Sequence, residues 1–289
     1  MNRETTRLDY LTRIERVQCY IHEHLDDELD LDKLADIACF SHCHWQRIYR
    51  GITGETAAST VRRLRLHRAA TELIKTSSDI LNIAKRAGYG SVAAFSRVFR
   101  SAYGEPPATY RNRTQASPEL NLINRKETKM YNTEIMDITR FRLAVVRHMG
   151  DYLGVEEDFM KVFMWSVKEG AIRGEPRMVG VYHDDPSSVT EDKLRSDVGI
   201  VIDDDIEIET PSDGPEIRAI DVAGGRHAVV TYKGPYAELL KAYDWIFTAW
   251  LPESGEEAGE NPIFEEYLND PKTTPPADLL TKIHLPLKG

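Results

Sequence analysis

Two sets of side chains in this sequence could do chemistry, and the first lies in two arginine-bearing stretches. Gln46, Arg47 and Arg50 recur at helical spacing in one stretch, and Arg97 and Arg100 do so about 50 residues later. Gln can bond adenine through two hydrogen bonds and Arg can bond guanine in the same way, so these residue types suit the reading of base edges. The residues that we predict to contact double-stranded DNA are His42, Cys43, Gln46, Arg47, Arg50, Ser91, Val92, Ala93, Ser96, Arg97 and Arg100.

The second set lies in the C-terminal half and combines tyrosines with one carboxylate. Tyr152 and Tyr236 occupy equivalent positions of an internal repeat, and so do Tyr182 and Tyr267. Strand alternation places Glu265 on the same face as Tyr267. A carboxylate among aromatic rings suits a lipophilic cation, which it binds through charge pairing and cation–π contact. We therefore predict an effector site formed by Tyr152, Tyr182, Tyr236, Glu265 and Tyr267.

Short helices must position the first set. Apolar residues at 3.6-residue spacing predict helices over 10–24, 31–38, 42–51, 57–75, 80–87 and 92–103. The second and third of these helices form one helix-turn-helix unit, and the last two form another. Ser41 and Ser91 precede the second helix of each unit, where a serine can cap the helix by accepting a backbone N–H bond. Further arginines that suit contacts with DNA phosphates are Arg62, Arg63, Arg65, Arg68, Arg111 and Arg113.

A repeated arrangement of strands must position the second set. Eight alternating apolar runs predict strands, and residues 154–169 and 236–251 predict helices. Residues 137–152 match residues 221–236 at seven of sixteen positions. Each copy reads strand, strand, helix, strand, strand, so two packed copies give an α+β domain with a cleft between them. Gly180 is the repeat partner of Glu265, so one wall of the cleft carries a carboxylate and the other leaves room for a ligand. Aromatic residues at helical spacing that we predict to be core are Phe159, Phe163, Trp165, Tyr243, Phe247 and Trp250.

The charge is divided between the two halves. The whole chain of 289 residues has a net charge of −10. Residues 1–129 carry 21 basic and 16 acidic residues, a net charge of +5, whereas residues 130–289 carry 16 and 31, a net charge of −15. Residues 41–113 alone reach +9. This division favours DNA binding by the N-terminal half and cation binding by the C-terminal half.

Composition excludes other classes of protein. A hydrophobic content of 41% excludes a disordered chain. No window approaches about 20 uncharged apolar residues, so we expect no membrane contact. The N-terminus lacks the apolar core of a signal peptide, which predicts a cytoplasmic protein. The predicted organisation is multidomain: an all-α double helix-turn-helix domain over 1–113, a linker over 114–130, and an α+β domain of two repeated units over 131–289.

The stretches LDKLADIACFSHCHWQRIYR and GYGSVAAFSRVFRSAYGEPPATYR lie in a region, about residues 8–113, that resembles the AraC family of bacterial transcription regulators. The resemblance implies a monomeric module that places two recognition helices in adjacent major-groove turns of promoter DNA. It also implies that Gln46, Arg47 and Arg97 hold base-reading or backbone-reading positions. For a regulator of this kind we expect RNA polymerase as a further partner. The sequence departs from many relatives at Cys39, where they have glycine, and at Val92 and Ala93, where they often have polar residues.

GPY at 234–236, FEEYLNDP at 264–271 and TKIHLPL at 281–287 resemble the gyrase-inhibitor-like (GyrI-like) small-molecule-binding domain, and the match covers about residues 131–289. That family binds amphipathic, frequently cationic and drug-like compounds, and the resemblance implies that Glu265 contacts the ligand. The combination of the two domains is similar to the right origin-binding type of regulator, whose effector can also be anionic.

These observations predict a sequence-specific transcription regulator that binds a lipophilic, cationic small-molecule effector, and not an enzyme. Cys39, His42, Cys43 and His44 could form a metal or thiol-redox sensor, but they lack a recognised zinc spacing, so we expect no cofactor and no metal and leave the sensor as an alternative. Two alternatives remain open for the C-terminal half. It could be a small-molecule hydrolase in which Glu265 and a tyrosine activate water. It could also be a protein-interaction module that uses the acidic run Asp203–Asp205.

Overall fold

A computed structural model describes residues 3–41, 44–115, 131–208 and 215–289 of the chain. The chain divides into a helical unit and a sheet unit, and each is described by itself below. Among the described residues, no helix is long and apolar enough to cross a membrane.

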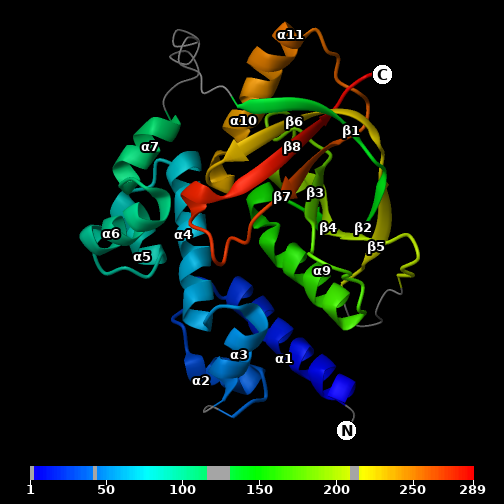
Figure 1. The fold of residues 1–289 in the computed structure, drawn as a ribbon. Helices are drawn as coiled ribbons and strands as arrows, with labels where there is room; N and C mark the ends of the chain where they lie inside the picture. The colour runs from blue at the N-terminus through cyan, green and yellow to red at the C-terminus, as the bar shows by residue number, and fades with distance from the viewer. Residues whose placement is uncertain (1–2, 42–43, 116–130, 209–214) are drawn as a thin grey trace. The chain divides into compact units, whose positions relative to one another are not determined.

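The helical unit contains two helix-turn-helix pairs joined by one long helix (Figure 1). Helices α2 and α3 form the first pair, α5 and α6 form the second, and α4 connects them. The helices of this unit are α1 (Arg3–Glu23), α2 (Leu31–Ile37), α3 (Trp45–Thr53), α4 (Ala57–Lys75), α5 (Ile80–Arg86), α6 (Val92–Tyr103) and α7 (Pro107–Gln115). Thr114 and Gln115, which we predicted to begin the linker, are therefore helical, and residues 116–130 lie outside the described residues.

The two predicted serine caps have different outcomes. The Ser91 side chain accepts a hydrogen bond from the backbone N–H of Ala94 at 3.2 Å, which confirms it as the cap of α6. The prediction for Ser41 is wrong, because α3 begins only at Trp45 and His44 holds the cap position without a side-chain bond. The backbone carbonyl of Ser41 accepts the N–H groups of His44 and Trp45, and residues 42 and 43 lie outside the described residues.

The sheet unit is one antiparallel sheet of eight strands (Figure 1). The strands are β1 (Asn132–Ile138), β2 (Phe141–Met149), β3 (Met178–Tyr182), β4 (Arg195–Ile202), β5 (Arg218–Val222), β6 (Gly225–Lys233), β7 (Ile263–Tyr267) and β8 (Leu280–Pro286). Their order across the sheet is β1-β6-β8-β7-β3-β4-β2-β5, which places β7 and β3 beside each other in the middle. The helical elements between these strands are η1 (Tyr152–Gly154), α9 (Glu156–Lys168), η2 (Glu191–Lys193), η3 (Tyr236–Glu238), α10 (Leu240–Trp245), η4 (Ile246–Trp250), α11 (Leu251–Ser254) and η5 (Pro276–Asp278), and residues 271–277, which include most of η5, group with the helical unit.

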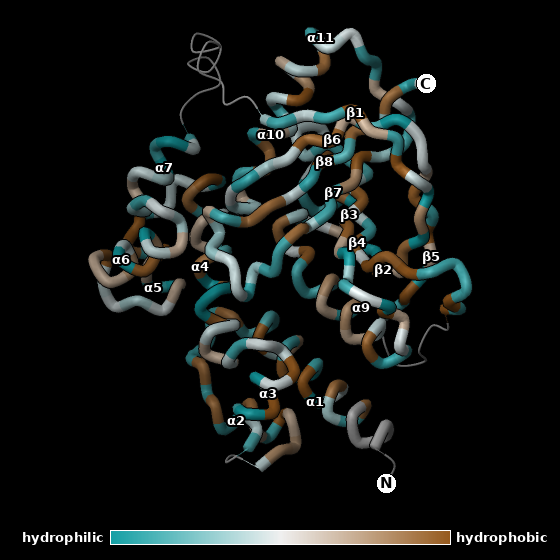
Figure 2. Tube along the Cα trace, in the orientation of Figure 1, coloured by the Kyte–Doolittle hydropathy of each residue, from teal (hydrophilic) through white to brown (hydrophobic). Residues whose placement is uncertain are grey.

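Alternation along the strands divides the apolar residues between the two faces of the sheet. Ala144 and Val146 of β2 pack with Trp165 of α9, whereas Leu143 and Val145 belong to another cluster. In the same way, Val230 of β6 and Ile283 of β8 pack with Trp245 of α10. Figure 2 shows these apolar positions as brown stretches along the strands. Both faces of the sheet therefore carry a core, and a side chain's position along its strand decides which core it meets.

The predicted helix over 236–251 is not one regular helix. It is divided into η3, α10, the π-helical stretch η4 and α11. A π-helical turn accommodates more residues than an α-helical turn, so it rotates the following residues relative to the preceding ones. Phe247, which we predicted to be core, lies in the π-helical stretch and is 44% exposed.

Candidate DNA-reading helices and effector site

Helix α3 presents a polar face opposite a buried aromatic face. Trp45 and Tyr49 are almost fully buried, as the helical spacing predicted. Gln46, Arg47 and Arg50 are exposed. His42 and Cys43 lie outside the described residues, so their predicted roles are not addressed by the structure.

Helix α6 repeats this arrangement. Phe95 and Phe99 are fully buried in the helical unit. Exposed positions on the helix are Val92, Ala93, Arg97 and Arg100, and Ser91 at its N-terminus is also exposed. Ser96 is only partly exposed, and the hydroxyl of Ser91 is engaged in the cap. Two of the predicted contacts therefore have less freedom to reach DNA than the two arginines.

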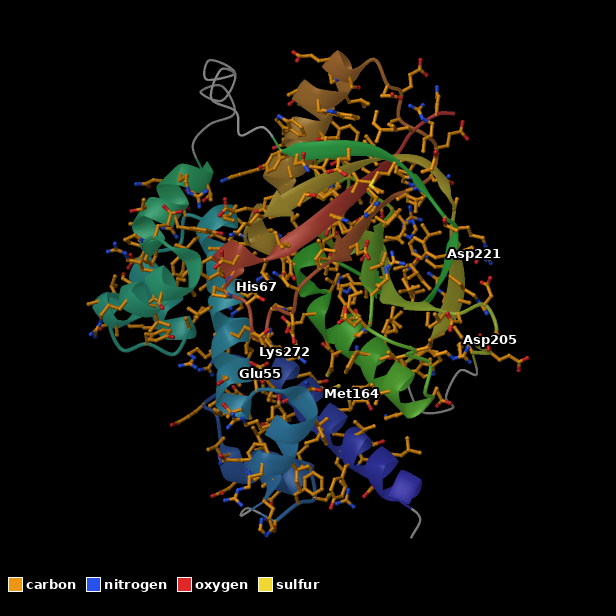
Figure 3. All side chains as sticks on the ribbon, viewed as in Figure 1. Glu55, His67, Met164, Asp205, Asp221 and Lys272 are labelled. Carbon is orange, nitrogen blue, oxygen red and sulfur yellow. The ribbon has the colours of Figure 1, made fainter. Side chains whose placement is uncertain are left out.

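The arginines of the helical unit fall into two groups. Within the described part of the chain, Arg47, Arg50, Arg97 and Arg100 have no ion-pair partner. Five of the six arginines predicted to contact phosphate have internal partners instead. Arg63 pairs with Glu55 at 2.8 Å (Glu55 is labelled in Figure 3), and Arg113 pairs with Glu105 at 2.5 Å. Arg111 donates to the backbone carbonyls of Leu73 and Ser78. Arg65 and Arg68 donate to groups in the loop after α1. Arg62 is exposed.

The predicted effector residues meet around one buried carboxylate. Glu265 is 4% exposed. Its two oxygens accept hydrogen bonds from the hydroxyls of Tyr243 and Tyr267, each at 2.7 Å. Because the single proton of the Tyr267 hydroxyl goes to Glu265, the hydroxyl of Tyr182 donates in turn to the Tyr267 oxygen at 2.5 Å. We call these four residues, together with Tyr152 and Tyr236, the tyrosine cluster.

Tyr152 and Tyr236 complete the cluster through ring contacts. The ring of Tyr152 packs edge-on against Tyr182, with 4.8 Å between centroids, and the ring of Tyr236 packs against Tyr267 at 5.3 Å. The hydroxyl of Tyr152 donates to the backbone carbonyls of Asp184 and Arg195. The structure thus brings together all five side chains that the repeat and the alternation singled out.

Burial controls the ionisation of the cluster. Burial raises the pKa of Glu265 to about 7, even though the bonds from Tyr267 and Tyr243 favour its charged form. Burial and the neighbouring carboxylate also raise the pKa of Tyr182, Tyr243 and Tyr267 well above the ordinary value. The phenols therefore stay protonated near neutral pH, and the only group that titrates there within the cluster is Glu265.

The prediction about Gly180 needs a correction. Gly180 and Glu265 are direct cross-strand partners on β3 and β7. A Cβ on Gly180 would lie 2.9 Å from the hydroxyl oxygen of Tyr182. The space that the missing side chain leaves is thus filled by the ring of Tyr182, because alternate residues of one strand share a face.

Two residues that we assigned to the core contact the cluster. Tyr243 of α10 bonds Glu265 directly, and the ring of Phe159 of α9 lies 5.3 Å from that of Tyr267. The signal that could have found them is the repeat itself, since Phe159 and Tyr243 are separated by the same 84 residues that relate Tyr152 to Tyr236.

Other candidate sites have structural partners. The acidic run Asp203–Asp205 forms ion pairs with Arg140 and Arg173, at distances from 2.9 to 3.2 Å, and Asp221 of β5 also pairs with Arg140 (Asp205 and Asp221 are labelled in Figure 3). Among the described residues, no group of three His, Cys, Asp or Glu side chains could hold a metal ion.

Comparison with known proteins gives matches to both halves. Residues 131–288 match the GyrI-like small molecule binding domain, and residues 34–113 match a helix-turn-helix domain. The chain is 38% identical over 100 residues to the regulatory protein SoxS of Escherichia coli strain K12, which covers 35% of this chain and 94% of SoxS. It is 23% identical over 285 residues to the right origin-binding protein of the same strain, which covers 89% of this chain and 96% of that protein. A crystal structure of the EcmrR C-terminal domain aligns with a TM-score of 0.44 and 19% identity, over 55% of this chain and 98% of that chain.

Proposed function

The chain belongs to the AraC family of helix-turn-helix transcription regulators and carries a GyrI-like small-molecule-binding domain, and on this premise we propose a function for each half. The helical unit binds promoter DNA through α3 and α6. The sheet unit binds a lipophilic cation at the tyrosine cluster. Binding of the cation changes the occupancy of DNA or the contact with RNA polymerase, with a coupling free energy of about 1–3 kcal/mol that acts equally in both directions.

The proposed domains are those of the sequence analysis: a DNA-binding domain over 1–113, a linker over 114–130 and an effector domain over 131–289. We further propose that the effector domain consists of two repeated units. The strand order supports this, because exchanging β1–β4 with β5–β8 reproduces the same order read from the opposite edge. On this view the cluster lies on the pseudo-two-fold axis, between β3 and β7.

The observation that favours a cationic effector is the set of hydrogen-bond partners around Glu265. Its hydrogen-bond partners are neutral phenols, so its charge has no counter-ion among them. A bound cation would supply that counter-ion, and the aromatic rings would add cation–π attraction. The cation would also lower the pKa of Glu265, so binding releases a proton below pH 7. We expect affinity to rise about tenfold per pH unit up to about pH 7 and then to level off.

Calorimetry with two ions of matched shape tests this proposal. We expect the intact protein to bind tetraphenylphosphonium, a cation, at least ten times more tightly than tetraphenylborate, an anion. Glu265→Gln should remove this preference. The helical content of this variant should be unchanged and its thermal unfolding should remain cooperative. Glu266→Gln is the matched control, since it removes a charge from the next residue of the same strand. Equal affinity of the two ions for the unsubstituted protein would reject the cationic effector.

For the DNA-binding half, we propose that Gln46, Arg47 and Arg97 read bases or backbone and that Arg50 and Arg100 support them. The support is their exposure and, among the described residues, the absence of ion-pair partners for the four arginines. Arg47→Ala should cost about 1–3 kcal/mol of binding free energy and relax specificity at one base position. An unchanged footprint and an unchanged base preference would contradict the assignment.

We propose that the effector domain is not a hydrolase. Both oxygens of Glu265 accept phenol hydrogen bonds, which leaves the carboxylate poorly placed to activate a water molecule. The check is incubation of bound compounds with the protein, followed by mass spectrometry. Turnover that Glu265→Gln abolishes would establish the enzyme instead.

A further inference from the structure

Helix α4 joins the two helix-turn-helix units, and two of its arginines connect the second unit to the loop that leads from α1 into α2, the first helix of the first unit. Arg65 and Arg68 lie three residues apart, so they occupy one side of the helix. Both guanidinium groups form hydrogen bonds within the protein. Each forms bonds to the loop after α1 on one side and reaches the second helix-turn-helix unit on the other.

Arg65 contacts the loop between α1 and α2 through hydrogen bonds and the second unit through packing. Its Nε donates to the carbonyl of Leu25 at 2.8 Å, and its Nη2 donates to the carbonyl of Asp27. Its Nη1 lies 2.7 Å from the position that a Cβ on Gly88 would take. Gly88 has a φ of +86° and forms the turn between α5 and α6. One rigid planar group thus sets the separation of the loop after α1 from the turn of the second unit.

Arg68 makes the second connection. Its Nη2 donates to Asp26 at 2.7 Å and to the carbonyl of Arg86, the last residue of α5, at 3.1 Å. Arg86 in turn pairs with Glu72 of α4 at 2.7 Å and approaches Asp26 at 3.5 Å. Burial alone would raise the pKa of Asp26, but Arg68 and Arg86 outweigh it and hold that pKa below its usual range.

We propose that Arg65 and Arg68 are positioning residues that fix the angle between α3 and α6, and through it the spacing of the two half-sites that the module accepts on DNA. The inference rests on the proposed function, in which both helices enter major grooves. One base pair adds about 3.4 Å and about a tenth of a turn to the separation of two half-sites. A rigid connection between the units therefore accepts one spacing, whereas a loose one accepts several.

The test measures spacing preference rather than affinity alone. Duplexes are selected from a random library with the intact chain, their half-sites are located by footprinting, and versions with one base pair added or removed between them are synthesised. Affinities are measured by fluorescence anisotropy at one salt concentration. The variants are Arg65→Lys and Arg68→Lys, which keep the charge but lose the planar fork. Arg62→Lys is the matched control, because Arg62 is exposed on the same helix.

We expect the unsubstituted chain to prefer its selected spacing by about 100-fold, the scale of losing one or two base contacts. Arg65→Lys and Arg68→Lys should reduce this preference to about tenfold or less, while Arg62→Lys should lower affinity equally on every spacing or not at all. If Arg65→Lys does not melt cooperatively, Arg68→Lys decides the question. Folded variants that both keep the full preference would overturn the inference. If the unsubstituted chain has no spacing preference, both this inference and the proposal that α3 and α6 each enter a major groove would be overturned.

Discussion

Glu265 and Glu266 are neighbours on β7 and point to opposite faces of the sheet, where they meet opposite conditions. On one face, Glu265 accepts hydrogen bonds from two tyrosines and has no cation among these partners. On the other face, Glu266 accepts a bond from Arg177 at 2.7 Å and lies 3.7 Å from the Nε2 of His284. Burial raises the pKa of Glu265 to about 7, whereas His284 and Arg177 lower the pKa of Glu266 to about 2.

The difference between these glutamates separates a carboxylate that serves the fold from one that is available to a ligand. Glu266 has a counter-ion, Arg177, within the domain, so its charge stabilises the folded state. Glu265 has hydrogen bonds but no counter-ion among those partners, so its charge costs stability until a cation arrives. A site that pre-forms the hydrogen bonds and omits the cation is suited to bind one.

The largest expected effect is an opposite change in stability for the two neutral substitutions. Glu266→Gln should lower the free energy of unfolding at pH 7.5 by about 2–3 kcal/mol, because it removes a carboxylate whose pKa in the folded state is held at about 2. Glu265→Gln should raise it by about 1–3 kcal/mol, because it removes a buried charge without a counter-ion. Urea denaturation of each variant measures both values. Equal losses for both variants would break the contrast.

The next effect concerns the pH dependence of stability, in which the two glutamates act over separate pH ranges. The pKa of Glu265 is higher in the folded state than its ordinary 4.5, so its contribution to stability falls as the pH rises from about 4.5 to about 7. The pKa of Glu266 is lower in the folded state, so its contribution is lost as the pH falls from about 4.5 to about 2. Glu265→Gln should flatten the first range and leave the second unchanged. Stability profiles of the two variants that coincide would refute this.

A smaller effect is expected for the cation that neutralises Glu266. Arg177 is 47% exposed and screened by water, so Arg177→Gln should cost about 1 kcal/mol or less of unfolding free energy. It should leave tetraphenylphosphonium affinity within twofold, because Arg177 bonds the glutamate on the other face. A large change in that affinity would show that the two faces are coupled through the strand.

The smallest effect concerns the glycine opposite Glu265. Gly180→Ala would place a methyl group 2.9 Å from the Tyr182 hydroxyl, and the end of that side chain can shift to avoid it. We expect a loss of less than about tenfold in tetraphenylphosphonium affinity, with little change in stability. The control is Gly90→Ala in the helical unit, where a Cβ has open space. An improved affinity would show that Tyr182 must move aside for the ligand.

The sequence predicted local structure best where one signal dominates. Helical spacing predicted that Phe95 and Phe99 lie on the buried face of α6 and Arg97 on its exposed face, and the serine directly before α6 predicted its N-cap. The same reasoning failed at Ser41, because α3 begins only at Trp45 and its cap position is held by His44. It also failed along 236–251, where the helix is interrupted by a π-helical stretch and Phe247 within that stretch is exposed. Both are departures from regular helix geometry, which a periodic pattern of residues does not predict.

For the effector site, the sequence by itself determined that Glu265 and Glu266 face opposite ways, because alternation is a property of one strand. The internal repeat also predicted four of the tyrosines that gather around Glu265, namely Tyr152, Tyr182, Tyr236 and Tyr267. Only the tertiary structure decided what each carboxylate meets. Arg177 lies 89 residues before Glu266, and Tyr243 lies 22 residues before Glu265, so each contact depends on how distant segments pair and pack. The physical reason is that a counter-ion acts through space, at a range of a few ångströms, and its position is set by strand register and helix packing rather than by spacing along the chain.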